Sequence, residues 1–108
     1  METEIEQLFQ FGFTKIEKGM SEESIVDFMK VLSLIPNHIA ALYQISYALC
    51  RLNRHKEALI YSSRVVDLTP DWYSFMERAA IKKALGDIEG EEADRNKAWE
   101  IGKIACWG

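Results

Sequence analysis

Two histidines and two cysteines are the side chains best suited to act as bases, nucleophiles or soft metal ligands. His38 and His55 stand at or beside predicted turns, and neither has a histidine or carboxylate four residues away, the spacing of a helical metal site. Cys50 and Cys106 are far apart and lack the C-x-x-C spacing of a redox or zinc motif. A Cys–His nucleophile would also need a third group to orient the histidine, and helix geometry offers none. We therefore predict no metal, no cofactor and no catalytic residue.

The acidic stretch at residues 87–92 is the other candidate, because it looks like a calcium-binding loop. It has no glycine at the sixth place, and Ala98 stands where such a loop has its bidentate glutamate. Acidic residues here are better explained as the first turn of a helix, where the helix dipole favours negative charge. The sequence also has no glycine-rich phosphate loop. We therefore expect a protein that is not an enzyme.

Composition and charge restrict the partners. The net charge is −4, which argues against nucleic acid, because domains that bind phosphate backbones are basic. No apolar stretch approaches the roughly 18 residues of a membrane span, and the acidic start is unlike a secretion signal. Two lone cysteines fit a reducing compartment. We expect no membrane insertion, a cytoplasmic location and, at this length, one domain over residues 1–108.

The apolar residues predict the elements. They recur every three or four positions, as in Leu42, Ile45 and Leu49, which is the period of amphipathic helices. Pro36 and Pro70 each follow such a run and would end a helix. The expected fold class is all-α, with six helices near residues 5–18, 21–34, 38–52, 55–68, 72–85 and 88–102.

The helix-breaking residues recur at a fixed interval. Pro36 and Pro70 are 34 residues apart, as are Gly19 and Asn53, and Gly86 follows Asn53 after 33 residues. A period near 34 with two helices in each copy is typical of a helical-hairpin solenoid.

The positions within each copy resemble those of the tetratricopeptide repeat. They are Leu8, Phe11, Gly12, Gly19, Phe28, Val31 and Pro36, then Leu42, Ile45, Ser46, Asn53, Ala58, Val65 and Pro70, then Phe75, Ala79, Gly86, Ala98 and Ile101. Small residues such as Gly12 and Ser46 allow two antiparallel helices to approach to about 8–10 Å. The resemblance implies an α-solenoid of three helix-turn-helix repeats in a right-handed superhelix. The repeats would cover about 5–38, 39–71 and 72–104, leaving 105–108 as a tail.

The third copy departs from the family pattern. Arg78 stands where leucine is preferred, Glu91 where a small residue is expected and Arg95 where an apolar residue is common. Glu91 and Arg95 are four residues apart, so they can pair on one helical face. Because the last repeat of a solenoid must turn a polar face to water, we interpret these charges as a cap. The alternative is a degenerate repeat.

The resemblance places the binding surface on the concave face, lined by the first helix of each repeat. Helical spacing assigns ten residues to it: Phe9, Gln10, Phe13, Tyr43, Gln44, Tyr47, Arg51, Tyr73, Met76 and Glu77. Half of them are aromatic, and aromatic rings are favoured anchors in binding clefts. We predict a groove for an apolar or amphipathic peptide, oriented by hydrogen bonds from Gln44, Arg51 and Glu77. The alternatives are that the rings pack on one another, or that the short N-terminal segment covers Phe9 and Phe13.

The C-terminal segment is apolar and carries Trp99, Ile104 and Trp107. Such a segment either folds back as a cap or mediates self-association, which would give a homodimer through the third repeat.

The leading interpretation is a non-catalytic protein–protein interaction module, an adaptor or small chaperone. Its size, acidity and aromatic groove are similar to those of the small tetratricopeptide chaperones of bacterial type III secretion. The alternative is a structural protein that assembles with itself. A clamp for acidic C-terminal tails is not supported. Family members with that clamp carry Lys, Asn and Arg on this surface, where the sequence has residues such as Phe9, Phe13 and Glu77.

Overall fold

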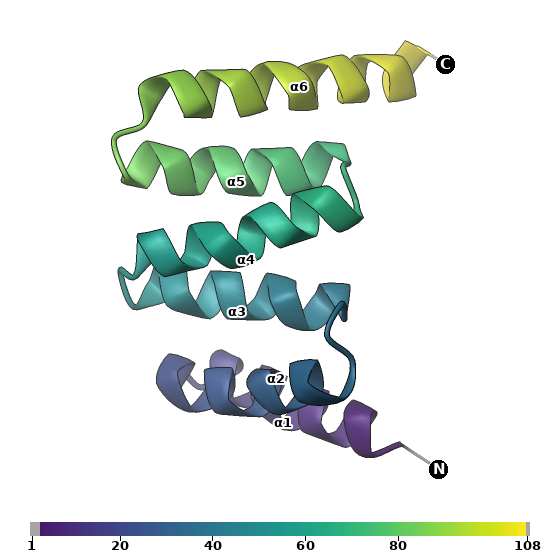
Figure 1. Ribbon diagram of the computed structural model, residues 1–108, viewed down its shortest axis with the longest axis vertical. Coiled ribbons are helices and arrows are strands. Elements are labelled where there is room, and N and C mark those ends of the chain that lie inside the picture. Colours follow the sequence, from purple (N-terminus) through teal and green to yellow (C-terminus); the bar gives the residue numbers. More distant parts are fainter. Residues whose placement is uncertain (1–2, 108) are drawn as a thin grey trace.

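The computed structural model describes the backbone of residues 3–107 and the side chains of residues 3–102. This range forms six helices: α1 (Glu4–Glu17), α2 (Ser21–Leu34), α3 (Ile39–Arg51), α4 (His55–Leu68), α5 (Trp72–Ala84) and α6 (Ile88–Trp107). Figure 1 shows them stacked in chain order, within overall extents of 41 × 33 × 22 Å. The predicted all-α class is confirmed, and the first five helices agree with their predicted ranges to within one residue at each end.

Each helical hairpin closes through a residue in the left-handed conformation. The φ angle is 77° at Gly19, 59° at Asn53 and 78° at Gly86. The following residue donates its backbone N–H to a carbonyl five positions earlier, at 2.8–2.9 Å, in the pairs Met20–Lys15, Arg54–Leu49 and Asp87–Lys82. This closure satisfies carbonyls that the end of a helix leaves unpaired, and glycine or asparagine adopts it with the least strain. The recurring breakers of the sequence are therefore the hairpin turns.

The connections between hairpins combine a proline with a helix cap. Ile35, before Pro36, has the extended backbone that a residue preceding proline prefers. At the start of α3 the Nδ1 atom of His38 accepts a hydrogen bond from the Ala41 N–H at 3.1 Å. The Asp71 carboxylate caps α5 in the same way. These caps set where the first helix of the second and third hairpins begins.

Small residues set the spacing within a hairpin. Gly12 in α1 is buried, and a Cβ atom added there would lie 2.9 Å from the ring of Phe28 in α2. In the second hairpin the Ser46 hydroxyl donates to the carbonyl oxygen of Ala58 at 3.2 Å. Ala79 occupies the corresponding place in the third hairpin and is 1% exposed. The predicted role of small residues at the helix crossings is confirmed.

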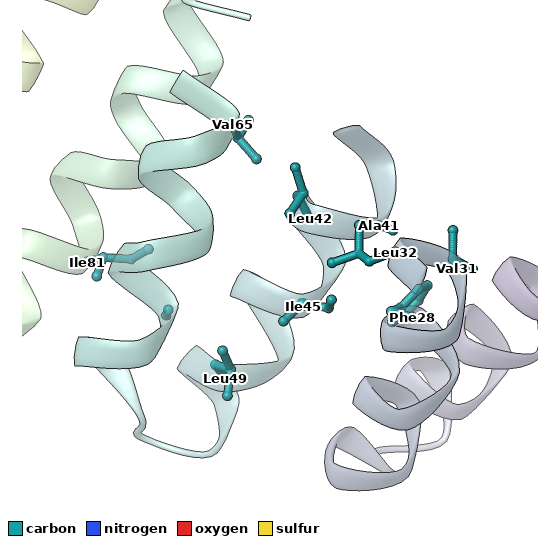
Figure 2. Close-up of a cluster of buried hydrophobic side chains, with 10 residues drawn as sticks. Phe28, Val31, Leu32, Ala41, Leu42, Ile45, Leu49, Val65 and Ile81 are labelled. Carbon is teal, nitrogen blue, oxygen red and sulfur yellow. The ribbon is translucent and has the colours of Figure 1, made fainter. Parts of the chain in front are cut away.

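One buried cluster joins the first two hairpins and reaches the third. Figure 2 shows Phe28, Val31 and Leu32 of α2 facing Ala41 and Ile45 of α3. The cluster continues through Val65 of α4 to Ile81 of α5. A second cluster of Val66, Phe75 and Ala98 connects α4, α5 and α6. Burying each large side chain contributes roughly 1.5–3 kcal/mol, so these clusters hold consecutive hairpins in register.

Ion pairs connect the two helices of the third hairpin. The Arg78 guanidinium donates two hydrogen bonds of 2.8 Å to the Asp94 carboxylate, and the Lys82 ammonium lies 3.0 Å from it. The predicted solvent-facing cap is wrong for Arg78, because its side chain is 19% exposed and enclosed between α5 and α6. Glu91 and Arg95 do pair, at 3.4 Å, as their spacing predicted.

The sixth helix continues past the predicted end at residue 102. Gly102 does not stop it; this glycine lies against Trp72 at the start of α5, where an added Cβ atom would be 2.9 Å from Cδ1. No proline follows to interrupt the helical hydrogen bonds. At 20 residues α6 is the longest helix. Neither it nor any other helix in the described range is apolar enough over a sufficient length to cross a membrane.

Candidate functional site

The ten residues predicted for the groove lie on α1, α3 and α5, the first helices of the three hairpins. Four of them are exposed: Gln10, Tyr47, Arg51 and Tyr73. The other six are half-buried: Phe9, Phe13, Tyr43, Gln44, Met76 and Glu77. They separate into a packed group on α1 and a more open group shared by α3 and α5.

The α1 group packs against its own hairpin. The rings of Phe9 and Phe13 are stacked with centroids 6.5 Å apart, and Phe9 meets Phe28 edge-on at 5.3 Å. The His38 ring lies 5.7 Å from Phe9, which ties α1 to the start of α3. Gln10 is placed elsewhere, in a separate cleft beside Phe11, Thr14, Lys15, Lys18 and Met20. At this end of the surface the aromatic rings mainly hold the fold together.

The open group begins with two stacked tyrosines. Tyr43 of α3 and Tyr73 of α5 have ring centroids 5.4 Å apart and an angle of 19° between the ring planes. Tyr73 also lies against Trp72, and these two side chains are 53% and 48% exposed. Met76 packs against the second buried cluster. The α3–α5 boundary therefore presents an aromatic surface.

Tyr47 and Arg51 form the next turn of α3. The Arg51 guanidinium donates a 3.2 Å hydrogen bond to the Tyr47 hydroxyl and stands 5.8 Å from the centre of the same ring. This contact restrains an aromatic side chain that is still 41% exposed. A restrained exposed ring can anchor a ligand at a low entropic cost.

Beside Tyr47 lies a cleft of about 240 Å³. Its walls are Tyr47, Cys50, His55, Glu77, Ala80 and Ile81, from α3, α4 and α5. Sequence analysis found Glu77 but missed His55, because nothing local in the sequence places the start of α4 beside the middle of α5. The cleft brings together the thiol, imidazole and carboxylate groups that the sequence leaves far apart.

The polar groups of this cleft are suited to accepting a hydrogen bond from a ligand through Glu77, and the Cys50 thiol is not activated as a nucleophile. Burial raises the pKa of the Cys50 thiol, and the Glu77 carboxylate raises it further, so the thiol stays protonated at neutral pH. A reactive cysteine needs the opposite shift. None of the ion pairs between described side chains uses Glu77, so this half-buried carboxylate can accept a hydrogen bond or a cation from a ligand.

The Tyr43 hydroxyl lies next to the same carboxylate. Burial raises the pKa of Tyr43 far above its ordinary value, and the neighbouring Tyr73 and Glu77 act in the same direction. No group in the described part of the chain forms a hydrogen bond with this buried hydroxyl. A narrow space that Tyr43 and Glu77 share with Ser46, Ser62 and Ser74 continues the polar surface inward.

The residues predicted for self-association divide between the described and undescribed parts of the chain. Trp99 stands on α6 and is 68% exposed. The side chains of Ile104 and Trp107 lie outside the described residues.

Known proteins share this arrangement of hairpins. The family model for the tetratricopeptide repeat matches residues 7–38, which hold most of the first hairpin and the connection after it. The second and third hairpins repeat the same turns and crossings. The first hairpin is therefore a tetratricopeptide repeat. The six helices of this chain form three such repeats.

Solved tetratricopeptide structures superpose on nearly the whole chain. MamA residues 41 to the end, from Desulfovibrio magneticus RS-1, has a TM-score of 0.85 and 26% identity, covering 91% of this chain and 56% of that one. The tetratricopeptide chain described here thus spans less than two thirds of the MamA chains that it matches.

Two further structures share the fold at lower identity. The first tetratricopeptide domain of Spaghetti (RPAP3), bound to the HSP90 peptide SRMEEVD, has a TM-score of 0.82 and 21% identity. It covers 90% of this chain and 78% of that one. PcrH, in complex with the chaperone binding region of PopB, has a TM-score of 0.86 and 19% identity, covering 95% and 86%. No curated protein matches the sequence.

Proposed function

We propose that this tetratricopeptide repeat protein is a non-catalytic interaction module, an adaptor or small chaperone, that binds an apolar or amphipathic segment of another protein. The groove would run along α3 and α5, with a smaller part on α1. The observation that carries the proposal is the cleft beside Tyr47, where a restrained aromatic ring and an uncompensated Glu77 carboxylate face the same space.

The walls of this cleft define the ligand. Ala80 and Ile81 offer apolar contact, and the exposed faces of Tyr47 and Tyr73 can cover an apolar side chain. Glu77 favours an N–H donor or a cationic side chain at one edge of that ligand. An acidic segment is disfavoured, because its carboxylates would meet Glu77 on a protein whose net charge is already −4.

The comparisons support the class of partner. In two solved structures of this fold the bound partner is an HSP90 peptide or the chaperone binding region of PopB. We propose a protein segment as the partner of this chain as well. The free Cys50 thiol and the acidic composition favour the reducing cytoplasm as the place where it acts.

A display library of random peptides tests the proposal. Purified protein should enrich peptides that combine apolar residues with lysine or arginine, and fluorescence anisotropy then gives their dissociation constants. Tyr47→Ala should weaken binding by about tenfold or more, as expected for an aromatic anchor. Glu77→Gln should weaken the cationic peptides and spare neutral ones.

The matched control is Ile60→Ala. Ile60 is 61% exposed on α4 and does not line the cleft, so its truncation should leave the dissociation constant unchanged. Enrichment of acidic peptides, or of peptides whose binding is indifferent to both Tyr47 and Glu77, would place the site on another surface. Circular dichroism verifies that each variant is folded.

A further inference from the structure

The first hairpin leaves uncovered an apolar position that is buried in the second hairpin. Phe11 on α1 stands one repeat before Ile45 on α3, at the same place in its hairpin. Ile45 is fully buried in the cluster that it shares with α2, whereas Phe11 is 58% exposed. A cleft of about 570 Å³ surrounds it, lined by Gln10, Phe11, Thr14, Lys15, Lys18 and Met20. This end of the described chain therefore lacks the cover that a preceding repeat gives Ile45.

The last hairpin has the complementary feature. Trp99 on α6 stands two repeats after Leu32 on α2 and one repeat after Val66 on α4. Leu32 and Val66 are 9% and 5% exposed, because each belongs to a cluster with the hairpin that follows it. Trp99 is 68% exposed. A side chain of this size left in water is the kind of surface that partners cover.

We propose that a second copy of this chain stacks end to end on the first, so that Trp99 of one copy packs against Phe11 of the next. The contact would repeat the junction between α2 and α3, where Leu32 and Ile45 belong to one buried cluster (Figure 2). Trp99 takes the place of Leu32, and Phe11 takes the place of Ile45. Each end of the chain thus carries one half of a junction that the fold already builds.

The charges at the two ends match as well. Inside the solenoid the start of α2 lies beside the turn between α3 and α4, as the 3.2 Å ion pair between Glu22 and Arg54 shows. End-to-end stacking would set the start of α6 beside the turn between α1 and α2 in the next copy by the same geometry. The start of α6 carries Glu89 and Glu92, and the turn after α1 carries the exposed Lys18, whereas Lys15 is paired with Asp27 within its own hairpin. Lys18 of one copy can therefore pair with the acidic start of α6 in the other copy and set the direction of the contact.

This contact joins the α6 end of one copy to the α1 end of the next. A pair of copies therefore still has one free α1 end and one free α6 end. Heterologous contacts of this kind add further copies and form open chains unless the rotation closes a ring. A homodimer through the third repeat alone would instead use α6 twice. The two arrangements can be separated by blocking one end at a time.

Light scattering coupled to size-exclusion chromatography tests the proposal on the purified protein. The mass of the wild type should rise steadily with concentration. Phe11→Glu and Trp99→Glu each block one end and should weaken self-association by about thirtyfold, the loss expected for a buried aromatic anchor. An equimolar mixture of the two should form a dimer and nothing larger, because each variant keeps the face that the other has lost. Ile60→Glu, away from both ends, should assemble like the wild type.

Three results would overturn the proposal. The first is a wild type that stays monomeric at every concentration. The second is assembly that Trp99→Glu abolishes and Phe11→Glu leaves intact, since that pattern shows a symmetric contact through α6. The third is a mixture of the two variants that contains only monomers although each is folded by circular dichroism.

Charge reversal provides a second test that leaves the apolar residues in place. Lys18 and Glu92 are both exposed, so Lys18→Glu and Glu92→Lys should fold normally. Each single variant should weaken association, and the double variant should restore it. A double variant that assembles no better than either single one would contradict the end-to-end arrangement. Because these residues lie outside the Tyr47 cleft, peptide binding should be unchanged in all of them.

Discussion

Arg78 and Asp94 face each other across the third hairpin and share two hydrogen bonds of 2.8 Å. Asp94 is 3% exposed, and Lys82 approaches the same carboxylate. The first hairpin has an ion pair at the positions that correspond to Lys82 and Asp94, where the Lys15 ammonium lies 2.6 Å from Asp27. In the second hairpin Leu49 and Tyr61 occupy those positions. The outer hairpins are thus joined by charge where the middle one uses apolar side chains.

Replacing Asp94 should destabilise the protein strongly. Asp94→Ala leaves the Arg78 and Lys82 cations without their shared carboxylate, and an unpaired charge enclosed between two helices costs about 3–5 kcal/mol. Urea unfolding followed by circular dichroism measures the change. Glu100→Ala, at an exposed position of α6, is the control and should have an effect within about 0.5 kcal/mol. A similar stability for both variants would mean that the ion pair contributes nothing.

The same carboxylate makes stability depend on pH. Burial alone would raise the pKa of Asp94, but the hydrogen bonds from Arg78 and Lys82 prevail and hold it below its ordinary value of 3.8. A pKa lowered by folding contributes stability that is complete above the unfolded value and is lost as the pH falls through the folded value. The free energy of unfolding of the wild type should therefore fall more steeply below about pH 5 than that of Asp94→Asn. Parallel curves for the two proteins would contradict the assignment.

Adding one methyl group at Gly12 should destabilise the first hairpin. Alanine favours the helix by about 0.5–1 kcal/mol over glycine, but its Cβ atom would lie 2.9 Å from a fully buried Phe28 ring. Overpacking costs about 1–3 kcal/mol, so we expect a net loss near 1 kcal/mol in thermal or urea unfolding. In a Phe28→Leu background the same change should be neutral or favourable. A stabilised Gly12→Ala in the wild-type background would show that the helices can separate freely.

The unpaired hydroxyl of Tyr43 predicts a substitution that improves stability. Tyr43→Phe removes a buried polar atom that has no hydrogen-bond partner in the described chain, and should stabilise the fold by up to about 1 kcal/mol. Tyr47→Phe is the matched comparison, because it deletes an exposed hydrogen bond from Arg51 and should cost about 0.5 kcal/mol. The melting temperature of Tyr43→Phe should therefore lie above that of the wild type, and that of Tyr47→Phe below it. The opposite order would contradict the prediction.

Enlarging Ala58 should disturb the second hairpin. Ala58 is fully buried, and its carbonyl oxygen accepts a hydrogen bond from Ser46 at the point where α3 and α4 cross. Ala58→Leu is expected to cost roughly 1–3 kcal/mol through overpacking. Ala40→Leu places the same side chain at an exposed position of α3 and should be nearly neutral. Equal melting temperatures would mean that the crossing lies elsewhere.

The amino-acid sequence by itself determined the elements and their order. The apolar period, Gly19, Asn53 and Gly86, and the two prolines located five helices to within one residue at each end. These signals are reliable because each acts over a few neighbouring residues, through backbone conformation and hydrogen bonds that close within one turn. The repeat interval then implied that hairpins stack in chain order, since each hairpin must bury its apolar face against the next.

Only the tertiary structure decided which side chains come together in one site and which apolar side chains remain exposed. It enclosed Arg78 against Asp94, placed Gly102 against Trp72 inside a continuing helix, and gathered Cys50, His55 and Glu77 in one cleft. It also left Phe11 and Trp99 exposed, although Ile45 and Val66, which stand one repeat away from them, are buried. The physical reason is that burial and proximity depend on which helix covers a residue, and that neighbour is contributed by a distant part of the chain.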